Sequence, residues 1–381
     1  MGVDVHKRGI GAFSHLTRGL YRHAFCDIHQ IPGEPDHGYV NHPDGDGSKP
    51  VQNYLNWKVS HDVACFEGMG QDVIAMNIGD AFCLGIPDWC SLVDYVAINR
   101  FTVPKEKVLR MLAKDFRRAI RMLKGYGITL SIDGGETADL PDQLRTLDVA
   151  GAIYAHRYRL GEVLTGEDIK AGDLIIGVES GGKAVYEEVP AGTLMCNGIT
   201  MVRHCLMARK LADMYPEISE PGSPYYGRFM PGDKPELLGG STVGEEITRP
   251  TRIFAPIQKG VLEKFGSAVH GMVYNTGGGA TKCLRIGNGV RYVKDSMPEP
   301  PGIFRLVQQE GRVRPREMRE DFNLGVGLDV IADAGAAYEI RDYITEEFGV
   351  GAWRIGKVRR ARGCNKLRME TPEGNFNFPS R

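Results

Sequence analysis

Residues 131–142 read SIDGGETADLPD, and this stretch decides how the rest of the chain is interpreted. The apolar run ITLSI at 128–132 predicts a strand that leads into Gly134 and Gly135. Acidic residues, among them Glu136, follow directly. Glycine lets a backbone approach a ligand closely, and successive backbone N–H groups can bind an anion. We therefore interpret the stretch as a loop that binds a charged ligand.

The segments on either side of this stretch predict alternating helices and strands. Residues 103–127 place apolar side chains at helical spacing, with a proline near the start and a glycine at the end, which predicts a long helix. Residues 91–98 and 147–158 predict strands, because they are rich in apolar, β-branched and aromatic side chains. Residues 72–86 predict a helix or a buried segment.

The second half of the chain mixes the same kinds of element. We expect helices at 199–215, 302–311 and 336–349, and a long loop at 216–249. A strand that passes into a helix is expected at 251–266, and a strand, a glycine turn and a helix start at 268–286. Further strands are expected within 168–182, 322–332 and 351–361, and the last of these should be the final strand of the chain. Mixed elements in both halves predict an α/β (α+β) fold.

The length of 381 residues permits two domains, each with its own core. A polar segment with three glycines at 157–173 predicts a join near 160–170, so that the domains would be 1–165 and 166–381. Residues 1 to about 40 mix glycine, histidine and proline, and we expect a mobile or partly helical arm there.

Composition argues against several classes of protein. A formal net charge of -1 gives no bulk attraction for nucleic acid or for an anionic membrane. The apolar runs are shorter than a membrane span, and the first residues lack the apolar segment of a secretion signal. The eight cysteines include no C-x-x-C pair, so we expect reduced thiols in a cytoplasmic protein.

One local departure from this charge balance lies near the end of the chain. Residues 352–368 carry seven Lys or Arg side chains and no acid. We interpret the segment as a solvated basic strand and tail. A phosphate or nucleic-acid patch is the alternative, although such patches usually bring interleaved aromatic side chains.

Four glycine-rich stretches remain after the familiar motifs are excluded. The chain has no P-loop, no G-x-G-x-x-G after a strand, no G-x-S-x-G and no H-E-x-x-H. The four stretches are HPDGDGSKP at 42–50, DGGETAD at 133–139, NTGGGATK at 275–282 and FNLGVG at 322–327. Lys49 and Lys282 could add positive charge to an anion site there.

Acidic side chains beside a phosphate require a bridging metal, and Mg²⁺ takes carboxylate and phosphate oxygens together. Asp44, Asp46, Asp80 and Glu136 would suit that task. Each feature alone is also explained by an ordinary turn, a helix cap or a solvated loop. Their joint occurrence favours a Mg-nucleotide site of a non-Walker type.

The set of motifs resembles the phosphoribosylformylglycinamidine cyclo-ligase family, also called aminoimidazole ribonucleotide synthetase. The matching stretches keep the family's order: DGDGSK at 44–49, DVIAMNIGD at 72–80, GGETADLPD at 134–142 followed by LDVAG, CNG at 196–198, RPTRIF at 249–254, NTGGG at 275–279 and FNLGVGLDVIA at 322–332. The resemblance covers about residues 40–360, and it looks closest to a longer bacterial variant.

This resemblance implies a two-domain α/β fold in which the N-terminal sheets of two subunits pair into a barrel-like homodimer core. Residues 1–165 would then be the ATP-binding and dimerisation domain, and residues 166–381 the C-terminal α/β domain. The implied activity is the ATP-dependent closure of formylglycinamidine ribonucleotide to aminoimidazole ribonucleotide in purine biosynthesis. Phosphorylation of the amide oxygen would make it a leaving group, and ADP and phosphate would be released.

The resemblance also assigns roles to residues. It implies Asp44, Asp80 and Glu136 as Mg²⁺ ligands, and Asp80, Glu136 and Lys49 as catalytic residues. ATP would lie against Asp44, Gly45, Gly47, Ser48, Lys49, Gly134, Gly135 and Thr137. The substrate would contact Asn197, Gly198, Thr276, Gly277, Gly278 and Gly279.

The chain departs from the family's pattern at a few places. Ser48 replaces a threonine, Gly79 stands where an asparagine is common before the aspartate, and Cys196 replaces a serine. The histidine that usually precedes S-N-G is missing. These changes leave open another ATP-using enzyme of the same superfamily with a different substrate, or a homologue without catalysis.

Overall fold

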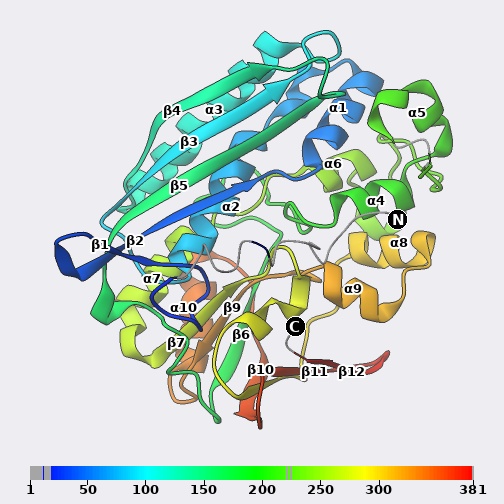
Figure 1. The fold of residues 1–381 in the computed structure, drawn as a ribbon. Helices are drawn as coiled ribbons and strands as arrows, with labels where there is room; N and C mark the ends of the chain where they lie inside the picture. The colour runs from blue at the N-terminus through cyan, green and yellow to red at the C-terminus, as the bar shows by residue number, and fades with distance from the viewer. Residues whose placement is uncertain (1–11, 13–18, 220–221, 224, 380–381) are drawn as a thin grey trace.

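The structure is a computed structural model, and it describes residues 12, 19–219, 222–223 and 225–379. Two β-sheets with helices packed on them make up this part of the chain (Figure 1). The predicted α/β class is therefore confirmed. Residues 1–11 and 13–18 of the predicted N-terminal arm lie outside the described residues. The described part of the arm was predicted wrongly, because it forms strands at His29–Ile31 and from Glu34 onward.

The first sheet has the order β1-β2-β5-β3-β4 and is built from the first half of the chain. Its strands are β1 (His29–Ile31), β2 (Glu34–Gly45), β3 (Trp89–Ile98), β4 (Leu130–Asp139) and β5 (Leu147–Arg159). The predicted loop at 131–142 is thus mostly an edge strand, because residues up to Asp139 pair in parallel with β3. Its glycines did not prevent this pairing.

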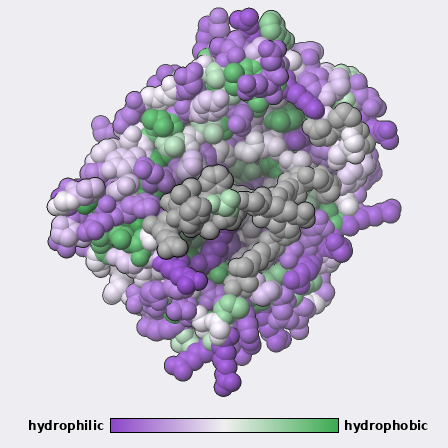
Figure 2. Space-filling model, viewed as in Figure 1, coloured by the Kyte–Doolittle hydropathy of each residue, from purple (hydrophilic) through white to green (hydrophobic). Residues whose placement is uncertain are grey.

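Helices cover one face of the first sheet, and no helix among the described residues covers the other face. Helices α1 (Lys49–Ser60), α2 (Met69–Phe82) and α3 (Lys105–Gly125) lie behind the sheet in the view of Figure 1. α3 forms where it was predicted, and its buried side chains recur every three to four residues. On the open face, Val93 and Tyr95 are 44% and 41% exposed. Figure 2 shows hydrophobic side chains at several places over this sheet, within a mostly hydrophilic surface.

The second sheet has the order β12-β11-β8-β10-β6-β9-β7. Its strands are β6 (Leu174–Glu179), β7 (Val269–Tyr274), β8 (Val290–Lys294), β9 (Val326–Ala332), β10 (Ala352–Arg360), β11 (Lys366–Thr371) and β12 (Gly374–Pro379). Two strands therefore follow the one predicted to be last. The basic segment forms β10 and the start of β11, and Lys357 pairs with Asp295.

The remaining helices connect and cover the two sheets. They are α4 (Ile199–Leu206), α5 (Arg209–Met214), α6 (Val243–Thr248), α7 (Ala255–Phe265), α8 (Gly302–Gly311), α9 (Pro315–Asp321) and α10 (Ala337–Phe348). The helix predicted at 199–215 breaks at Met207 and Ala208, because these residues bridge to Phe229 and Gly227. The predicted loop at 216–249 contains α6, which Thr242 and Glu245 cap. No strand forms at 251–254, where the chain enters α7 directly.

The sheets divide at the predicted join, between Arg159 and Leu174, but the hydrophobic cores do not divide there. Leu206, Phe304 and Phe322, from the second half of the chain, belong to the core that packs on the first sheet. A second core lies on the second sheet. No helix in the described ranges is both long and apolar enough to span a membrane.

Replacing Leu112 with alanine tests the packing of α3. Leu112 is buried against the first core, and its truncation should lower the free energy of unfolding by about 2–5 kcal/mol. The exposed Arg117 on the same helix is the control, and Arg117→Ala should change stability by no more than about 0.5 kcal/mol. Urea denaturation measures both. Equal losses would contradict this packing.

Candidate active site

Two of the predicted carboxylates meet where the end of β2 approaches the end of α2. The ligand atoms of His42, Asp44 and Asp80 lie within 4.8 Å of one another, and His42 Nε2 is 3.3 Å from Asp80 Oδ2. On the far side of Asp80, Lys282 Nζ lies 3.5 Å from Oδ1. The cluster therefore joins the first sheet, α2 and η7 (Gly279–Arg285), the 3₁₀ helix after β7.

Backbone contacts position Asp44 in this cluster. The Gly45 N–H donates to Asp44 Oδ1 at 2.8 Å, and Asn77 Nδ2 donates to the Asp44 carbonyl oxygen at 3.1 Å. Burial raises the pKa of the Asp44 carboxyl, the Gly45 hydrogen bond opposes this increase, and Asp80 adds to it. A cation shared by Asp44 and Asp80 would relieve their repulsion.

The donor set of this cluster fits Mg²⁺. Asp44 and Asp80 offer the hard carboxylate oxygens that Mg²⁺ prefers, and this ion usually completes its shell with water and phosphate oxygens. Lys282 lies at Oδ1 of Asp80 and His42 at Oδ2, so an ion bound by Asp80 would share these oxygens with the two side chains. These two carboxylates could hold the ion without any ligand from the rest of the described chain.

Glu136, the third predicted ligand, is not part of this cluster in a single chain. It lies exposed on the edge strand β4, opposite Tyr95 of β3. The register runs from Asp44 through β5 and β3 to Gly135, so three strand spacings, about 14 Å, separate this part of β4 from Asp44. Gly134 and Thr137 share this exposed position. Their predicted contacts with ATP stay predictions.

Gly135 has a structural reason to be glycine. A Cβ at this position would lie 2.3 Å from Oδ1 of Asp94 on the neighbouring strand β3. Burial raises the pKa of Asp94, and its carboxyl group occupies the space that a side chain would take. A side chain at 135 would therefore have to displace the carboxyl group of Asp94.

Lys49, predicted to assist at the phosphates, is fully buried in an ion pair. Its ammonium group lies 2.8 Å from Asp72 Oδ1 and donates to the Arg249 carbonyl oxygen at 2.7 Å. The Thr251 N–H also donates to Asp72 Oδ1, at 2.7 Å. Burial acts to lower the pKa of Lys49, but Asp72, Cys196 and Asp46 together outweigh it and the net shift is upward. The phosphate role of Lys49 stays a prediction, and its observed contacts are structural.

A second buried cluster surrounds this ion pair. Asp46, Asp72 and Cys196 have ligand atoms within 4.8 Å of one another. The Cys196 sulfur lies 3.3 Å from the Thr251 hydroxyl, and burial raises the pKa of this thiol well above its usual range. Cys196 therefore packs as a neutral thiol beside the D-G-D-G turn.

The D-G-D-G turn also contacts the segment that follows Cys196. A Cβ on Gly47 would lie 3.2 Å from the Cys196 carbonyl oxygen, and the Ser48 hydroxyl bonds to Thr200 of α4 at 2.7 Å. The serine at 48 thus keeps a hydroxyl contact. Motifs that lie 150 residues apart in sequence meet here.

The residues predicted to bind substrate converge on one another. Asn197 Oδ1 lies 3.4 Å from the position that a Cβ on Gly277 would take. The hydroxyl of Thr276 bonds to the ammonium group of Lys282, which also reaches Asp80. The structure thus brings the N-G and T-G-G-G motifs to the carboxylate cluster, while their contact with a substrate stays a prediction.

Phe322 fixes the two glycine turns of this region. A Cβ on Gly198, which precedes α4 at φ 70°, would lie 2.2 Å from the Phe322 ring. A Cβ on Gly279 would lie 2.4 Å from the Phe322 carbonyl oxygen. Gly277 and Gly278, which directly precede Gly279, are exposed, so their backbone groups face solvent beside the cluster.

Several buried polar atoms in this region have no hydrogen-bond partner within the described part of the chain. They are both carboxylate oxygens of Asp46, Asn77 Oδ1, Asn197 Nδ2 and the Tyr274 hydroxyl. Buried polar groups are nearly always satisfied, so a group of exceptions in one place indicates a site for water or ligand. Sequence reasoning did not identify His42, Asp72, Asn77 or Tyr274. The spacing of Asp72 and Asn77 before Asp80 on one helix was the available signal.

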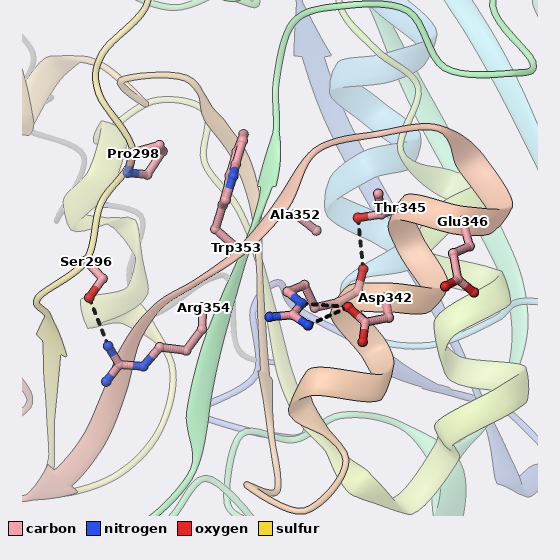
Figure 3. A pocket seen from close by; sticks show the side chains of 9 residues that line it. Ser296, Pro298, Asp342, Thr345, Glu346, Ala352, Trp353 and Arg354 are labelled. Atoms are coloured by element: carbon pink, nitrogen blue, oxygen red, sulfur yellow. Dashed lines mark hydrogen bonds and ion pairs between the residues drawn. The ribbon is translucent and has the colours of Figure 1, made fainter.

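A surface pocket of about 650 Å³ lies elsewhere, between β10, α10 and residues 296–298 (Figure 3). Its charged side chains bond within the protein, Arg354 to Ser296 and Arg341 to Asp342. None of the predicted site residues lines it. We therefore assign the candidate site to the cluster around Asp80.

Solved structures with this arrangement of sheets include nucleotide-bound proteins. A HypE–HypF complex aligns with a TM-score of 0.57 at 13% identity, covering 97% of this chain and 98% of that one. HypE in complex with ATP gives 0.53 at 13% identity, covering 100% and 95%. PurL of T. maritima complexed with ADP gives 0.53 at 11% identity, covering 97% and 48%. At these identities the likeness establishes the fold.

The relatives found by sequence match this chain at higher identity than the solved structures do. No family model matches the chain. A protein of Methanocaldococcus jannaschii is 32% identical over 324 residues, 85% of this chain and 79% of the relative. One of Methanothermobacter thermautotrophicus is 33% identical over 335 residues, 86% and 85%. Both are named phosphoribosylformylglycinamidine cyclo-ligase. The resemblance to a longer bacterial variant stays a prediction.

Breaking the buried ion pair should cost much more stability than breaking an exposed one. Lys49→Met leaves the Asp72 carboxylate buried without its charged partner and should lower the free energy of unfolding by about 3–5 kcal/mol. Lys114 forms an ion pair with Glu67 of similar length, 2.7 Å, at the surface, and Lys114→Met should cost less than about 1 kcal/mol. Chemical denaturation compares the two.

The double variant Lys49→Met with Asp72→Asn is the second control for this pair. It removes both charges, so it should recover part of the lost stability. If the double variant were less stable than Lys49→Met alone, Asp72 would hold its position for reasons other than this ion pair.

Proposed function

The chain belongs to the phosphoribosylformylglycinamidine cyclo-ligase family, and on that premise we propose that it closes the imidazole ring of aminoimidazole ribonucleotide. The substrate is formylglycinamidine ribonucleotide, and ATP is converted to ADP and phosphate. The observation that carries the proposal is the meeting of Asp44, Asp80 and Lys282 with the Asn197 and Thr276 loops. This meeting supports a single location for the metal, the phosphoryl group and the substrate.

The reaction balances as a phosphoryl transfer followed by a cyclisation. The terminal phosphoryl group of ATP moves to the amide oxygen of the substrate, which leaves ADP. The amidine-side nitrogen then forms a bond with the activated carbon, and the C–O bond to phosphate breaks. One proton leaves the attacking nitrogen. The products are the aminoimidazole ring, ADP and phosphate.

The residues of this chain bind and orient the reactants. Asp44 and Asp80 would hold Mg²⁺, which, when bound, neutralises phosphate charge and favours phosphoryl transfer. Lys282 lies beside Asp80 and the T-G-G-G turn, where its positive charge can attract a phosphate oxygen. Backbone N–H groups of Gly277 and Gly278 are exposed at the same turn and can bind an anion.

The site is completed by a second copy of the chain in this proposal. Glu136 lies on the open side of the first sheet, in the same row as Tyr95, and far from Asp44 of its own chain. No strand in the described chain pairs with the outer edge of β4, or with the outer edge of β2 from Val40 to Gly45. A homodimer that joins these edges would bring Glu136 of one chain to Asp44 of the other.

A different ATP-using reaction on the same fold is the alternative. The glycine at 79 and the cysteine at 196 favour it, because both remove a polar side chain that the family usually has at those places. Thermal stability measured with ATP and Mg²⁺, with and without the proposed substrate, separates the two. A cytoplasmic location is part of the proposal, and the eight free cysteines support it.

Ring closure itself is the test of the proposed function. Purified protein with formylglycinamidine ribonucleotide, ATP and Mg²⁺ should form the aminoimidazole, read by diazo coupling, and ADP in equal amounts. Asp80→Asn should lower kcat by about 10²-fold or more, because it removes a charge at the transferred phosphoryl group. Asp142→Asn, in an exposed turn, is the control and should keep full activity. ATP binding without product would favour the alternative.

Mixing two inactive variants tests the shared site. Asp80→Asn and Glu136→Gln should each be inactive as homodimers while remaining folded. After refolding together, half of the dimers contain one site with both native residues, which restores about a quarter of the wild-type activity. Light scattering should show a dimer throughout. No recovery in a dimeric mixture would place Asp80 and Glu136 in the same subunit's site.

A further inference from the structure

Tyr274 and Gly79 form a matched pair beside the carboxylate cluster. Gly79 directly precedes Asp80 on α2, and Tyr274 is the last residue of β7. A Cβ on Gly79 would lie 2.6 Å from the Tyr274 ring, which is closer than two carbon atoms can approach. The ring therefore occupies the space that any side chain at 79 would need. The glycine that departs from the family's asparagine is explained by this aromatic ring.

Packing fixes the Tyr274 ring, but its hydroxyl group forms no hydrogen bond within the described part of the protein. The ring packs edge-on against Phe254 with centroids 5.7 Å apart, and Tyr274 is completely buried. The hydroxyl has no hydrogen-bond partner among the described residues. Burial raises the pKa of this phenol well above its ordinary value, so it remains a neutral donor.

The charged groups that act on this hydroxyl identify its surroundings. They are the side chains of Cys196, Asp80, Asp72 and Asp44, which belong to the two clusters described above. All of them are acceptors or neutral thiols, yet none is within hydrogen-bonding distance. The hydroxyl is a buried donor near these carboxylates that no described group satisfies, so an acceptor oxygen brought beside it by a ligand would satisfy it.

We propose that the Tyr274 hydroxyl donates a hydrogen bond to the terminal phosphoryl group of ATP as that group is transferred. This inference rests on the proposed ATP site at Asp44 and Asp80, since a metal there would bring phosphoryl oxygens to the same place. The phenol would take over the donor role of the amide that is absent at position 79. In this chain, Tyr274 would thus bind the phosphoryl group beside the glycine at 79.

The test compares binding of a non-hydrolysable ATP analogue and of ADP, each with Mg²⁺, by calorimetry. Tyr274→Phe keeps the ring and removes only the hydroxyl. It should weaken the analogue about tenfold, the usual effect of losing one hydrogen bond to a charged group, and leave ADP binding unchanged. Its melting temperature should not fall, because the hydroxyl has no partner in the protein.

Tyr158→Phe is the matched control. Tyr158 is equally buried, and its hydroxyl donates to the Ala81 carbonyl oxygen at 3.1 Å. Its loss should lower the melting temperature by a few degrees and leave binding of both nucleotides unchanged. Unchanged analogue binding in Tyr274→Phe would overturn the inference, and so would an equal loss for analogue and ADP.

A rescue by exchange is the second arm of the test. Tyr274→Ala opens the space beside α2, so Gly79→Asn added to it should recover several-fold of the lost analogue affinity. In the wild-type background Gly79→Asn should instead weaken binding, because it collides with the ring. If the double variant recovered no affinity for the analogue, the idea that the Tyr274 phenol replaces an amide at position 79 would be overturned. These binding measurements do not require ring closure. They therefore test the role of Tyr274 even if the cyclo-ligase assay gives no product.

Discussion

The buried ion pair between Lys49 and Asp72 is the contact on which the placement of the site depends. It joins the first turn of α1 to the first turn of α2, and through Arg249 and Thr251 it joins both to the segment before α7. Two charges at zero exposure are costly to desolvate, so removal of either one alone leaves the other uncompensated. The pair fixes α2 along its axis and thereby determines where its other end lies.

The C-terminal end of α2 carries residues of the candidate site. Asn77 reaches back to the backbone of β2, Gly79 admits Tyr274, and Asp80 meets Lys282. A shift of α2 by one residue would replace the glycine that admits the ring by Ile78 or Asp80, and neither can fit there. The Lys49–Asp72 ion pair thus fixes one end of α2, and the packing of Tyr274 against Gly79 fixes the other. Together these contacts restrict the position of the Asp80 carboxylate.

Sequence reasoning identified the helices and strands whose patterns are strong, and the motif order led to the family. It placed Asp44, Asp80 and the T-G-G-G turn in one site because each carries a local signal of glycine beside a charged or polar residue. It could not locate Tyr274 against Gly79, since nearly 200 residues separate them and a buried tyrosine looks like any core residue. It treated residues 131–142 as a loop, because paired glycines are unusual in a strand. The parallel pairing with β3 outweighed that local preference.

The position of Glu136 shows how function and assembly are linked in this fold. Within the described part of one chain, the outer edges of strand β4 and of the Asp44 end of β2 pair with no further strand, and the sheet exposes Val93 and Tyr95. Free strand edges and exposed apolar side chains are unfavourable in an isolated protein. In the proposed dimer, pairing of these edges satisfies the backbone groups, covers the apolar face and brings the missing carboxylate to Asp44. The contacts that would stabilise the dimer are therefore the ones that would complete the site, so a chain that lost its partner would lose both together.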